Sequence, residues 1–288
     1  MRSRLPSVYF WMIAPAVVVA LGLIVFPLGR TVWLSFTNQG VTGAGTWVGF
    51  ANYTRLLGDS GFWNSVGVSL VFITSTVFLE LVIAWCLALL LERTVRGLTP
   101  TLRMLFTVPM MLSPVIVGVA WRALFNPHFG WVNAILGTPG QDWLGNPDRA
   151  LPVLIALNVW QWTPFLFLMI SAGLLSVPGE VKEAARIDGA GGFRLFRSIV
   201  FPLTLPVTLV AILLRALDAT KSFDLPFTLT GGGPGTTTQT VAIFLYRRAF
   251  SDWQQGYASA VAVGLTVGLT LIAIIYLRIT RAVERRFL

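Results

Sequence analysis

Residues that many catalytic and metal sites require are nearly missing from this chain. Its 288 residues include one cysteine, Cys86, and one histidine, His128, so neither a disulfide framework nor a zinc site with clustered cysteine and histidine ligands can be built. The sequence also lacks the phosphate-binding pattern G-x-x-x-x-G-K-[ST], which indicates that the chain does not hold ATP by itself in the usual way. We therefore expect no catalytic residue, metal or cofactor in this chain.

Charged residues are scarce as well. They make up 11% of the chain, whereas 55% of the residues are hydrophobic and the mean hydropathy is +0.75. Soluble domains contain roughly 25% charged residues, so this composition predicts an all-α polytopic membrane protein. The net charge of +9 does not indicate a nucleic-acid partner, because the basic residues stand in short groups beside apolar runs, where membrane orientation explains them.

Long apolar runs predict six membrane spans within a single transmembrane domain that covers residues 1–288. A helix needs about 20 predominantly apolar residues to cross the hydrocarbon core of a bilayer. Pro109 and Pro114 in the third run predict a kink or a discontinuous helix there. The expected spans are about 9–28, 63–91, 104–124, 151–175, 203–227 and 257–277.

Lysine and arginine residues between these spans divide unevenly between the two sides of the membrane. Thirteen lie on one side: Arg2, Arg4, Arg93, Arg96, Arg103, Lys182, Arg186, Arg194, Arg197, Arg278, Arg281, Arg285 and Arg286. Five lie on the other: Arg30, Arg55, Arg149, Arg247 and Arg248. Since basic residues are retained on the cytoplasmic side, both termini and the loop 178–202 are expected in the cytoplasm, with the loop 230–240 outside.

The loop 178–202 is expected to fold as a helical elbow. Pro178 fits a first helical turn, and Gly189 supplies the left-handed residue that ends such a helix. A second short helix is expected over 193–201, ending at Pro202. Ala184 and Ala185 at the tip permit close approach of another protein, and polar contacts around them come from Glu183, Arg186 and Asp188. The alternative is an ordinary hairpin between two spans.

One face of the fourth span combines amide groups with aromatic rings, the combination that usually holds sugars. Hydroxyl groups need amide or carboxylate partners, whereas the apolar faces of sugar rings pack on flat aromatic surfaces. Hydrogen bonding between helices is the alternative explanation of the same stripe. Its members are Asn158, Gln161, Trp162 and Phe165, at positions i, i+3, i+4 and i+7.

Ionisable residues inside spans indicate a pathway or a buried network. Glu80 in the second span is expected to face the bundle interior with a partner, either in a structural hydrogen bond or against the solute. With a rise of about 1.5 Å per residue, Asp218 in the fifth span lies at a depth similar to that of Asn158, so one site could use both. The alternative is a salt-bridge network that only holds the bundle together, among Arg215, Asp218 and Lys221, with Asp224 nearby.

Part of the elbow resembles the EAA loop of ABC-importer permeases. The spacing of Glu183-Ala184-Ala185, Gly189, Ile199 and Phe201-Pro202 is similar to that loop, although the family usually has leucine at the position of Phe201. From Asn52 onward the order of segments resembles the carbohydrate class of these permeases. The run Gly231-Gly232-Gly233-Pro234 is similar to the first of the two permeases in such heterodimers.

This resemblance implies the type I importer permease fold, with a cytoplasmic coupling helix that contacts the ATPase subunits. It implies coupling residues Glu183, Ala184, Ala185, Asp188 and Gly189, solute contacts at Asn158, Gln161, Trp162, Phe165, Leu217 and Asp218, and binding-protein contacts at Gly232, Gly233 and Pro234. It also implies a bacterial or archaeal inner-membrane location and four kinds of partner besides lipid: a second homologous permease, two ATPase subunits that bind ATP and Mg²⁺, an extracytoplasmic binding protein and a sugar.

The expected function is therefore that of a non-enzymatic permease subunit that imports a mono- to oligosaccharide. A permease for glycerol-3-phosphate or a related glycerophosphodiester is an alternative with the same fold. An ion-coupled secondary transporter is an alternative from another class, favoured by the charges within the spans. A membrane-embedded enzyme is disfavoured, because Glu80, Asp218 and Asp224 lack an evident metal or nucleophile beside them.

Overall fold

The computed structural model describes residues 6–40, 45–94 and 99–287, and these ranges are almost entirely helical. Of the basic residues counted for orientation, Arg2, Arg4 and Arg96 lie outside the described residues. The elements are α1 (Pro6–Ser35), α2 (Ala51–Gly58), α3 (Ser60–Thr94), α4 (Thr99–Met111), α5 (Pro114–Leu124), α6 (Trp131–Leu136), α7 (Pro147–Leu175), α8 (Gly179–Ile187), α9 (Gly192–Leu195), η1 (Phe196–Val200), α10 (Phe201–Thr220), α11 (Asp224–Thr230), α12 (Val241–Tyr246), η2 (Arg247–Ser251) and α13 (Gln255–Phe287).

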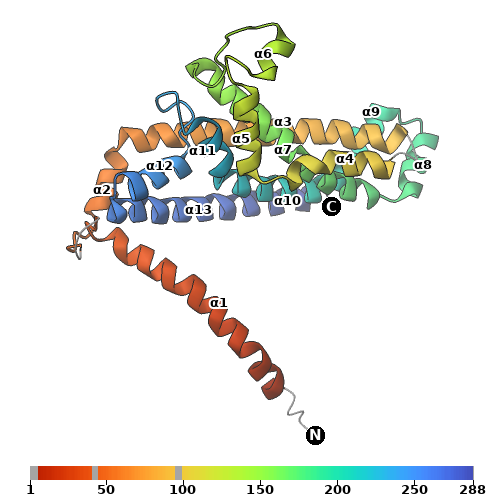
Figure 1. The fold of residues 1–288 in the computed structure, drawn as a ribbon. Coiled ribbons are helices and arrows are strands. Elements are labelled where there is room, and N and C mark those ends of the chain that lie inside the picture. The colour runs from red at the N-terminus through yellow and green to blue at the C-terminus, as the bar shows by residue number, and fades with distance from the viewer. Residues whose placement is uncertain (1–5, 41–44, 95–98, 288) are drawn as a thin grey trace. The chain divides into compact units, whose positions relative to one another are not determined.

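Five helical stretches of the described residues are long and apolar enough to cross a membrane: Phe10–Ser35, Ser60–Leu91, Pro147–Leu175, Gly192–Thr220 and Gln255–Thr280. The remaining expected span is interrupted, with α4 ending at Met111 and α5 beginning at Pro114 (Figure 1). Proline has no N–H to continue a helical ladder, and its ring disfavours helical geometry in the residue before it. The predicted discontinuity is confirmed and lies at Pro114, whereas Pro109 is inside α4.

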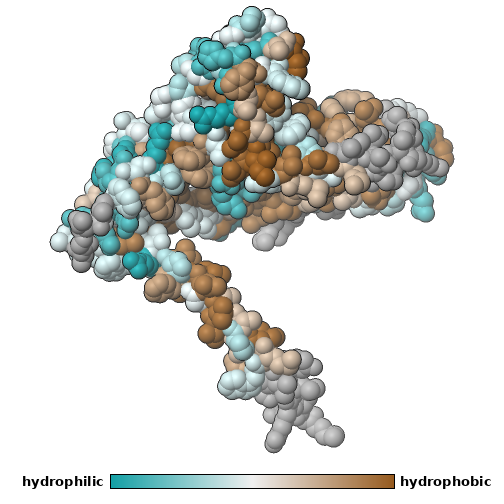
Figure 2. All heavy atoms as spheres, viewed as in Figure 1, coloured by the Kyte–Doolittle hydropathy of each residue, from teal (hydrophilic) through white to brown (hydrophobic). Residues whose placement is uncertain are grey.

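The chain divides into two compact units, Met1–Ser60 with Leu245–Gly268, and Gly61–Phe244 with Leu269–Leu288. In the first unit, hydrophobic side chains cover much of α1 (Figure 2), and none of its most apolar window is buried within the chain. A helix that is apolar on all sides and unburied is suited to lipid or to a partner helix.

Polar contacts hold the short helix α2 in the first unit. The Nδ2 of Asn52 donates to the carbonyls of Ser35, at 2.9 Å, and of Thr37, at 2.8 Å. Tyr257 donates its hydroxyl to Asp59 at 2.7 Å, and the guanidinium of Arg55 lies 4.1 Å from the centre of the Tyr257 ring. The two bonds of Asn52 satisfy backbone carbonyls at and just beyond the end of α1, and the other two contacts join α2 and its flanking residue to Tyr257.

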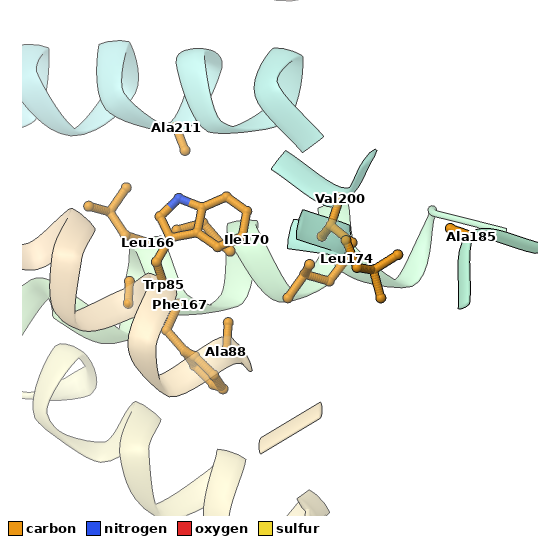
Figure 3. Packing of buried hydrophobic residues seen from close by; sticks show 11 residues of the cluster. Trp85, Ala88, Leu166, Phe167, Ile170, Leu174, Ala185, Val200 and Ala211 are labelled. Atoms are coloured by element: carbon orange, nitrogen blue, oxygen red, sulfur yellow. The ribbon is translucent and has the colours of Figure 1, made fainter. Parts of the chain in front are cut away.

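The second unit is a bundle in which α7 packs against α4 and α10, with α8 and α9 at one end (Figure 1). Its α7 is the most buried span, since 61% of the most apolar window lies inside the chain. An apolar cluster near α8 includes Trp85 of α3, Phe167 and Ile170 of α7, and Ala211 of α10 (Figure 3). A second cluster around Phe72 and Leu154 joins α3 and α7 to α11. Both helices that carry candidate solute residues thus rest on apolar cores.

The expectation that the second elbow helix ends at Pro202 is wrong. The helix continues from Gly192 to Thr220 through one π-helical turn, η1, in which the N–H of Phe201 donates to the carbonyl of Phe196, five residues earlier. Pro202 cannot donate the bond that an α-helix requires, and the wider turn just before it absorbs the change of register.

The fifth span is also shorter than expected, because α10 ends at Thr220 and not near residue 227. The chain begins a new helix, α11, at Asp224, which places Pro226 in its first turn, where the missing N–H of proline costs no helical hydrogen bond. Lys221 and Asp224 consequently lie at helix ends. The span itself carries Arg215 and Asp218.

Candidate functional site

A buried ion pair joins α3 to α10 in the second unit. The side chain of Glu80 is 0% exposed and that of Arg215 is 1% exposed. The Nε and Nη2 of Arg215 donate to the two carboxylate oxygens of Glu80 at 2.8 and 2.9 Å. This fork-to-fork geometry is the strongest that arginine makes with a carboxylate. The prediction that Glu80 faces the interior with a partner is confirmed, and the partner is Arg215.

Three further groups surround the same guanidinium. Its Nη2 also donates to the side-chain oxygen of Asn158 in α7, and its Nη1 donates to Asp218 at 3.3 Å, one turn along α10. The guanidinium carbon lies 5.2 Å from the centre of the Trp162 ring, within range of a cation–π interaction. Arg215 therefore ties α3, α7 and α10 together. We call Glu80, Asn158, Trp162, Arg215 and Asp218 the charged cluster.

The two amide residues expected to bind solute are buried and make hydrogen bonds to other segments of the bundle. Asn158 is 1% exposed and its oxygen accepts from Arg215. Gln161 is 0% exposed, and its Nε2 donates at 3.0 Å to the carbonyl of Leu112, at the break between α4 and α5. That carbonyl needs a side-chain donor because the helix stops there. One atom of each amide thus bonds to a neighbouring segment, whereas the Oε1 of Gln161 is buried without a hydrogen-bond partner among the described residues.

Other expected solute residues remain accessible. The side chain of Asp218 is 48% exposed, and Trp162, Phe165 and Leu217 are partly exposed. Phe165 packs at the edge of the apolar cluster near α8. A carboxylate beside an aromatic ring can accept hydrogen bonds from hydroxyl groups while the ring covers an apolar face.

The expected network of Arg215, Asp218 and Lys221 forms only in part. Asp218 contacts Arg215, but Lys221 is exposed at the end of α10, and we find no ion pair for it in the part of the chain that the structure describes. Sequence reasoning missed Glu80 as the partner of Arg215. The signal available was two opposite charges alone in two apolar spans, which need one another in a medium that does not solvate them.

The elbow forms as expected at its first helix. Gly189 has φ +78°, and its N–H donates to the carbonyl of Arg186 at 3.1 Å, so the left-handed stop after α8 is confirmed. Ala185 is 7% exposed and packs in the apolar cluster (Figure 3), whereas Glu183, Ala184 and Asp188 are exposed. Ala184, not Ala185, therefore offers the small outward side chain.

Two large apolar residues on the elbow were not singled out from the sequence. Ile187 at the end of α8 is 86% exposed, and Phe193 in α9 is 74% exposed. They flank the Gly189 stop. The sequence signal for them was the presence of isolated apolar residues within a polar loop. Large apolar side chains exposed in this way are suited to contact with another protein.

The Gly-Gly-Gly-Pro loop at the other end of the unit is held by threonines. The hydroxyls of Thr230 and Thr238 lie 2.7 Å apart, and the hydroxyl of Thr238 donates to the carbonyl of Gly233 at 2.7 Å. Gly232 is buried, with φ +90°, whereas Gly233 and Pro234 border a hollow of about 340 Å³. The hollow is lined by Arg122, Phe125, Asn126, Pro127, Asp142, Leu144, Gly145, Leu229, Thr230, Gly233 and Pro234, and so is distinct from the charged cluster.

Comparison with known proteins gives consistent results. Residues 81–288 match the family described as binding-protein-dependent transport system inner membrane component. The chain is 34% identical over 286 residues to the trehalose/maltose transport system permease protein MalF of Thermococcus litoralis, covering 98% of this chain and 96% of that protein. It is 33% identical to the sulfoquinovosyl glycerol transport system permease protein SmoG of Agrobacterium fabrum, covering 94% and 89%.

A solved structure has the same fold. A chain of the bacterial alginate ABC transporter, crystallised in complex with an alginate pentasaccharide-bound periplasmic protein, superposes with a TM-score of 0.85. The match covers 96% of this chain and 95% of that chain at 19% identity. At this level of identity the likeness concerns the fold, and it confirms the expected all-α importer-permease architecture.

Proposed function

The chain belongs to the family of binding-protein-dependent transport system inner membrane components, and we propose that it is the permease subunit that carries a neutral sugar across the membrane in an ABC importer. The observation that carries the choice of solute is the pair formed by Asp218 and Trp162. A half-exposed carboxylate and a partly exposed indole lie around the same guanidinium, on two adjacent helices. Sugars bind to this combination of hydrogen-bond acceptor and flat ring.

The proposed assembly has three further kinds of protein component. A second, homologous permease completes the pathway, two ATPase subunits bind ATP and Mg²⁺, and an extracytoplasmic binding protein delivers the solute. Both termini and the elbow face the cytoplasm. This orientation is supported by the thirteen-to-five division of basic residues and by the family's inner-membrane location.

The elbow is the proposed contact with the ATPase subunits. Glu183, Ala184 and Asp188 are exposed on it, and Ile187 and Phe193 add apolar area. Gly189 fixes the direction in which the chain leaves α8, and Ala185 anchors the helix on the bundle core. Movement of the ATPases would thereby reach α7 and α10 through direct packing.

At the opposite end, the loop with Gly233 and Pro234 is the proposed contact with the binding protein. Those two residues border the hollow, whereas Gly232 is buried with φ +90° and serves the loop conformation. A concave surface with a few polar groups can receive a protruding loop of a partner.

Solute uptake by the complete complex in proteoliposomes tests this function. Radiolabelled trehalose is the first probe, because one relative, MalF of Thermococcus litoralis, is named for trehalose and maltose transport. We expect uptake that requires both the binding protein and ATP. Uptake driven by a proton or sodium gradient without ATPase subunits would contradict the proposal and favour a secondary transporter.

A further inference from the structure

The charged cluster places three ionisable groups in contact, and their charges do not cancel. The carboxylate of Glu80 takes both the Nε and one Nη edge of Arg215. Arg215 is thereby neutralised by a residue that is itself fully buried. Asp218 is then left as a carboxylate with one long contact of 3.3 Å and almost half of its surface exposed. The part of the cluster that a solute can reach has a net negative charge.

The hydrogen bonds of Arg215 lead to the same conclusion. A guanidinium has five N–H donors, and four of them are engaged by Glu80, Asn158 and Asp218. An anionic solute such as a phosphate ester binds arginine best through two parallel N–H bonds. Glu80 occupies the paired edge formed by Nε and Nη2, and at the other edge Asp218 takes Nη1 and Asn158 takes the second N–H of Nη2. Paired binding of an anion is therefore closed at both edges of the guanidinium.

We propose that Glu80 is a positioning residue that determines solute charge: by holding the paired edge of Arg215, it leaves Asp218 as the accessible charge and makes the cluster select neutral polyhydroxylated solutes over anionic ones. This inference rests on the proposed function and extends it. Glu80 has no exposed surface, so it acts through Arg215 and not by contact with solute. If Glu80 only stabilised the bundle, replacing it would not change the preference between neutral and anionic solutes.

The test measures access to the cluster directly, without relying on the preference of the binding protein. In the full complex, with Cys86→Ala as background, Leu217→Cys places a thiol next to Asp218 on a partly exposed position. The rate of maleimide labelling is measured with increasing trehalose or trehalose 6-phosphate. We expect trehalose to protect the thiol and the phosphate ester to need at least about tenfold higher concentration, because of repulsion by Asp218.

Glu80→Gln should lower the half-protecting concentration of trehalose 6-phosphate by about tenfold, because it releases the charge and the paired edge of Arg215. Glu80→Gln with Arg215→Gln should restore exclusion of the phosphate ester, since both charges are then gone and Asp218 remains. Lys221→Gln is the matched control, because it removes an exposed cation just beyond the cluster, and should leave the preference unchanged.

Removing one partner of a buried ion pair is strongly destabilising, so the Glu80→Gln variant can fail to fold or to assemble. Asp218→Asn then provides the test, because its half-exposed side chain has only one bond to Arg215 and its loss should also admit the phosphate ester. An unchanged preference in both Glu80→Gln and Asp218→Asn would overturn the inference. If neither solute protects the thiol while ATP-dependent uptake continues, the inference about Glu80 is overturned and the proposed function is unaffected. If the complex takes up no solute at all, the proposed function itself is contradicted.

Discussion

At the scale of single residues, Trp162 and Trp160 are neighbours on α7 with different surroundings. Trp162 lies over Arg215 in the charged cluster, whereas Trp160 packs edge to face on Trp121 at 5.7 Å. We expect Trp162→Ala to raise the half-saturating concentration for sugar uptake by about fivefold, the equivalent of roughly 1 kcal/mol of lost aromatic contact. Trp160→Ala is the matched control and should leave that concentration unchanged. Equal effects in dose-dependent uptake assays would show that neither ring contacts solute.

The sequence could predict which residues of this site are unusual, but not which of them meet. Asn158 and Gln161 stood out as amides in an apolar span, yet each could bond a solute or a neighbouring helix with equal chemistry. The structure gives their bonds to Arg215 and to the carbonyl of Leu112. Glu80 and Arg215 are 135 positions apart, and no local pattern specifies a pair at that separation. Local rules are sufficient for Gly189, where backbone conformation depends on the residue itself.

At the scale of elements, α8 depends on the left-handed residue that ends it. Gly189 has φ +78°, which a β-branched residue adopts only with strain of about 1–2 kcal/mol. Gly189→Val is therefore expected to displace the end of the elbow and to reduce copurification of the ATPase subunits. Gly191→Ala is the control, since Gly191 has φ −63° and open space around its Cβ position. If Gly189→Val copurifies with as much of the ATPase subunits as wild type does, the end of the elbow is not part of the contact with them.

The contact between α5 and α11 depends on one glycine. A Cβ on Gly118 would lie 1.8 Å from the hydroxyl oxygen of Thr228 and 2.9 Å from its Cβ. Gly118→Ala should force the two helices apart at a cost of about 1–3 kcal/mol, the usual range for overpacking. The midpoint of thermal unfolding in detergent should fall, whereas Gly67→Ala in α3, with no atom within 4 Å, should leave it nearly unchanged. Identical midpoints for the two variants would show that α5 and α11 do not pack this closely.

Element boundaries were harder to predict than the elements themselves. Pro202 is a helix-breaking signal in the sequence, but a single π-turn carries the helix past it to Thr220. The same residue type at Pro114 and Pro226 does start new helices. At Pro202 the preceding turn widens, and Phe196 and Phe201, which flank that turn, both pack against Trp85.

At the scale of the whole molecule, the orientation of the chain follows from its basic residues. In a Cys86→Ala background, Ala134→Cys in the exposed part of α6 should react with an impermeant thiol reagent added outside, and Gly191→Cys should not. Ala134 is helical and Gly191 has φ −63°, so a cysteine at either position causes no backbone strain. Gly140 and Gly235 in the outer loops are less suitable labelling positions, because both have positive φ. Labelling of Gly191→Cys in sealed, right-side-out vesicles would invert the proposed topology.

The proposed function requires this one chain to hold a solute site and a separate coupling elbow. The most direct measurement records solute uptake and ATP hydrolysis in the same proteoliposomes for two variants. The double variant Asp218→Asn, Trp162→Ala should lose most uptake and keep basal ATP hydrolysis, because the elbow is untouched. Glu183→Lys, which reverses an exposed charge on α8, should lose both activities together with the bound ATPase subunits. Unchanged uptake in the double variant, or wild-type coupling in Glu183→Lys, would contradict this account.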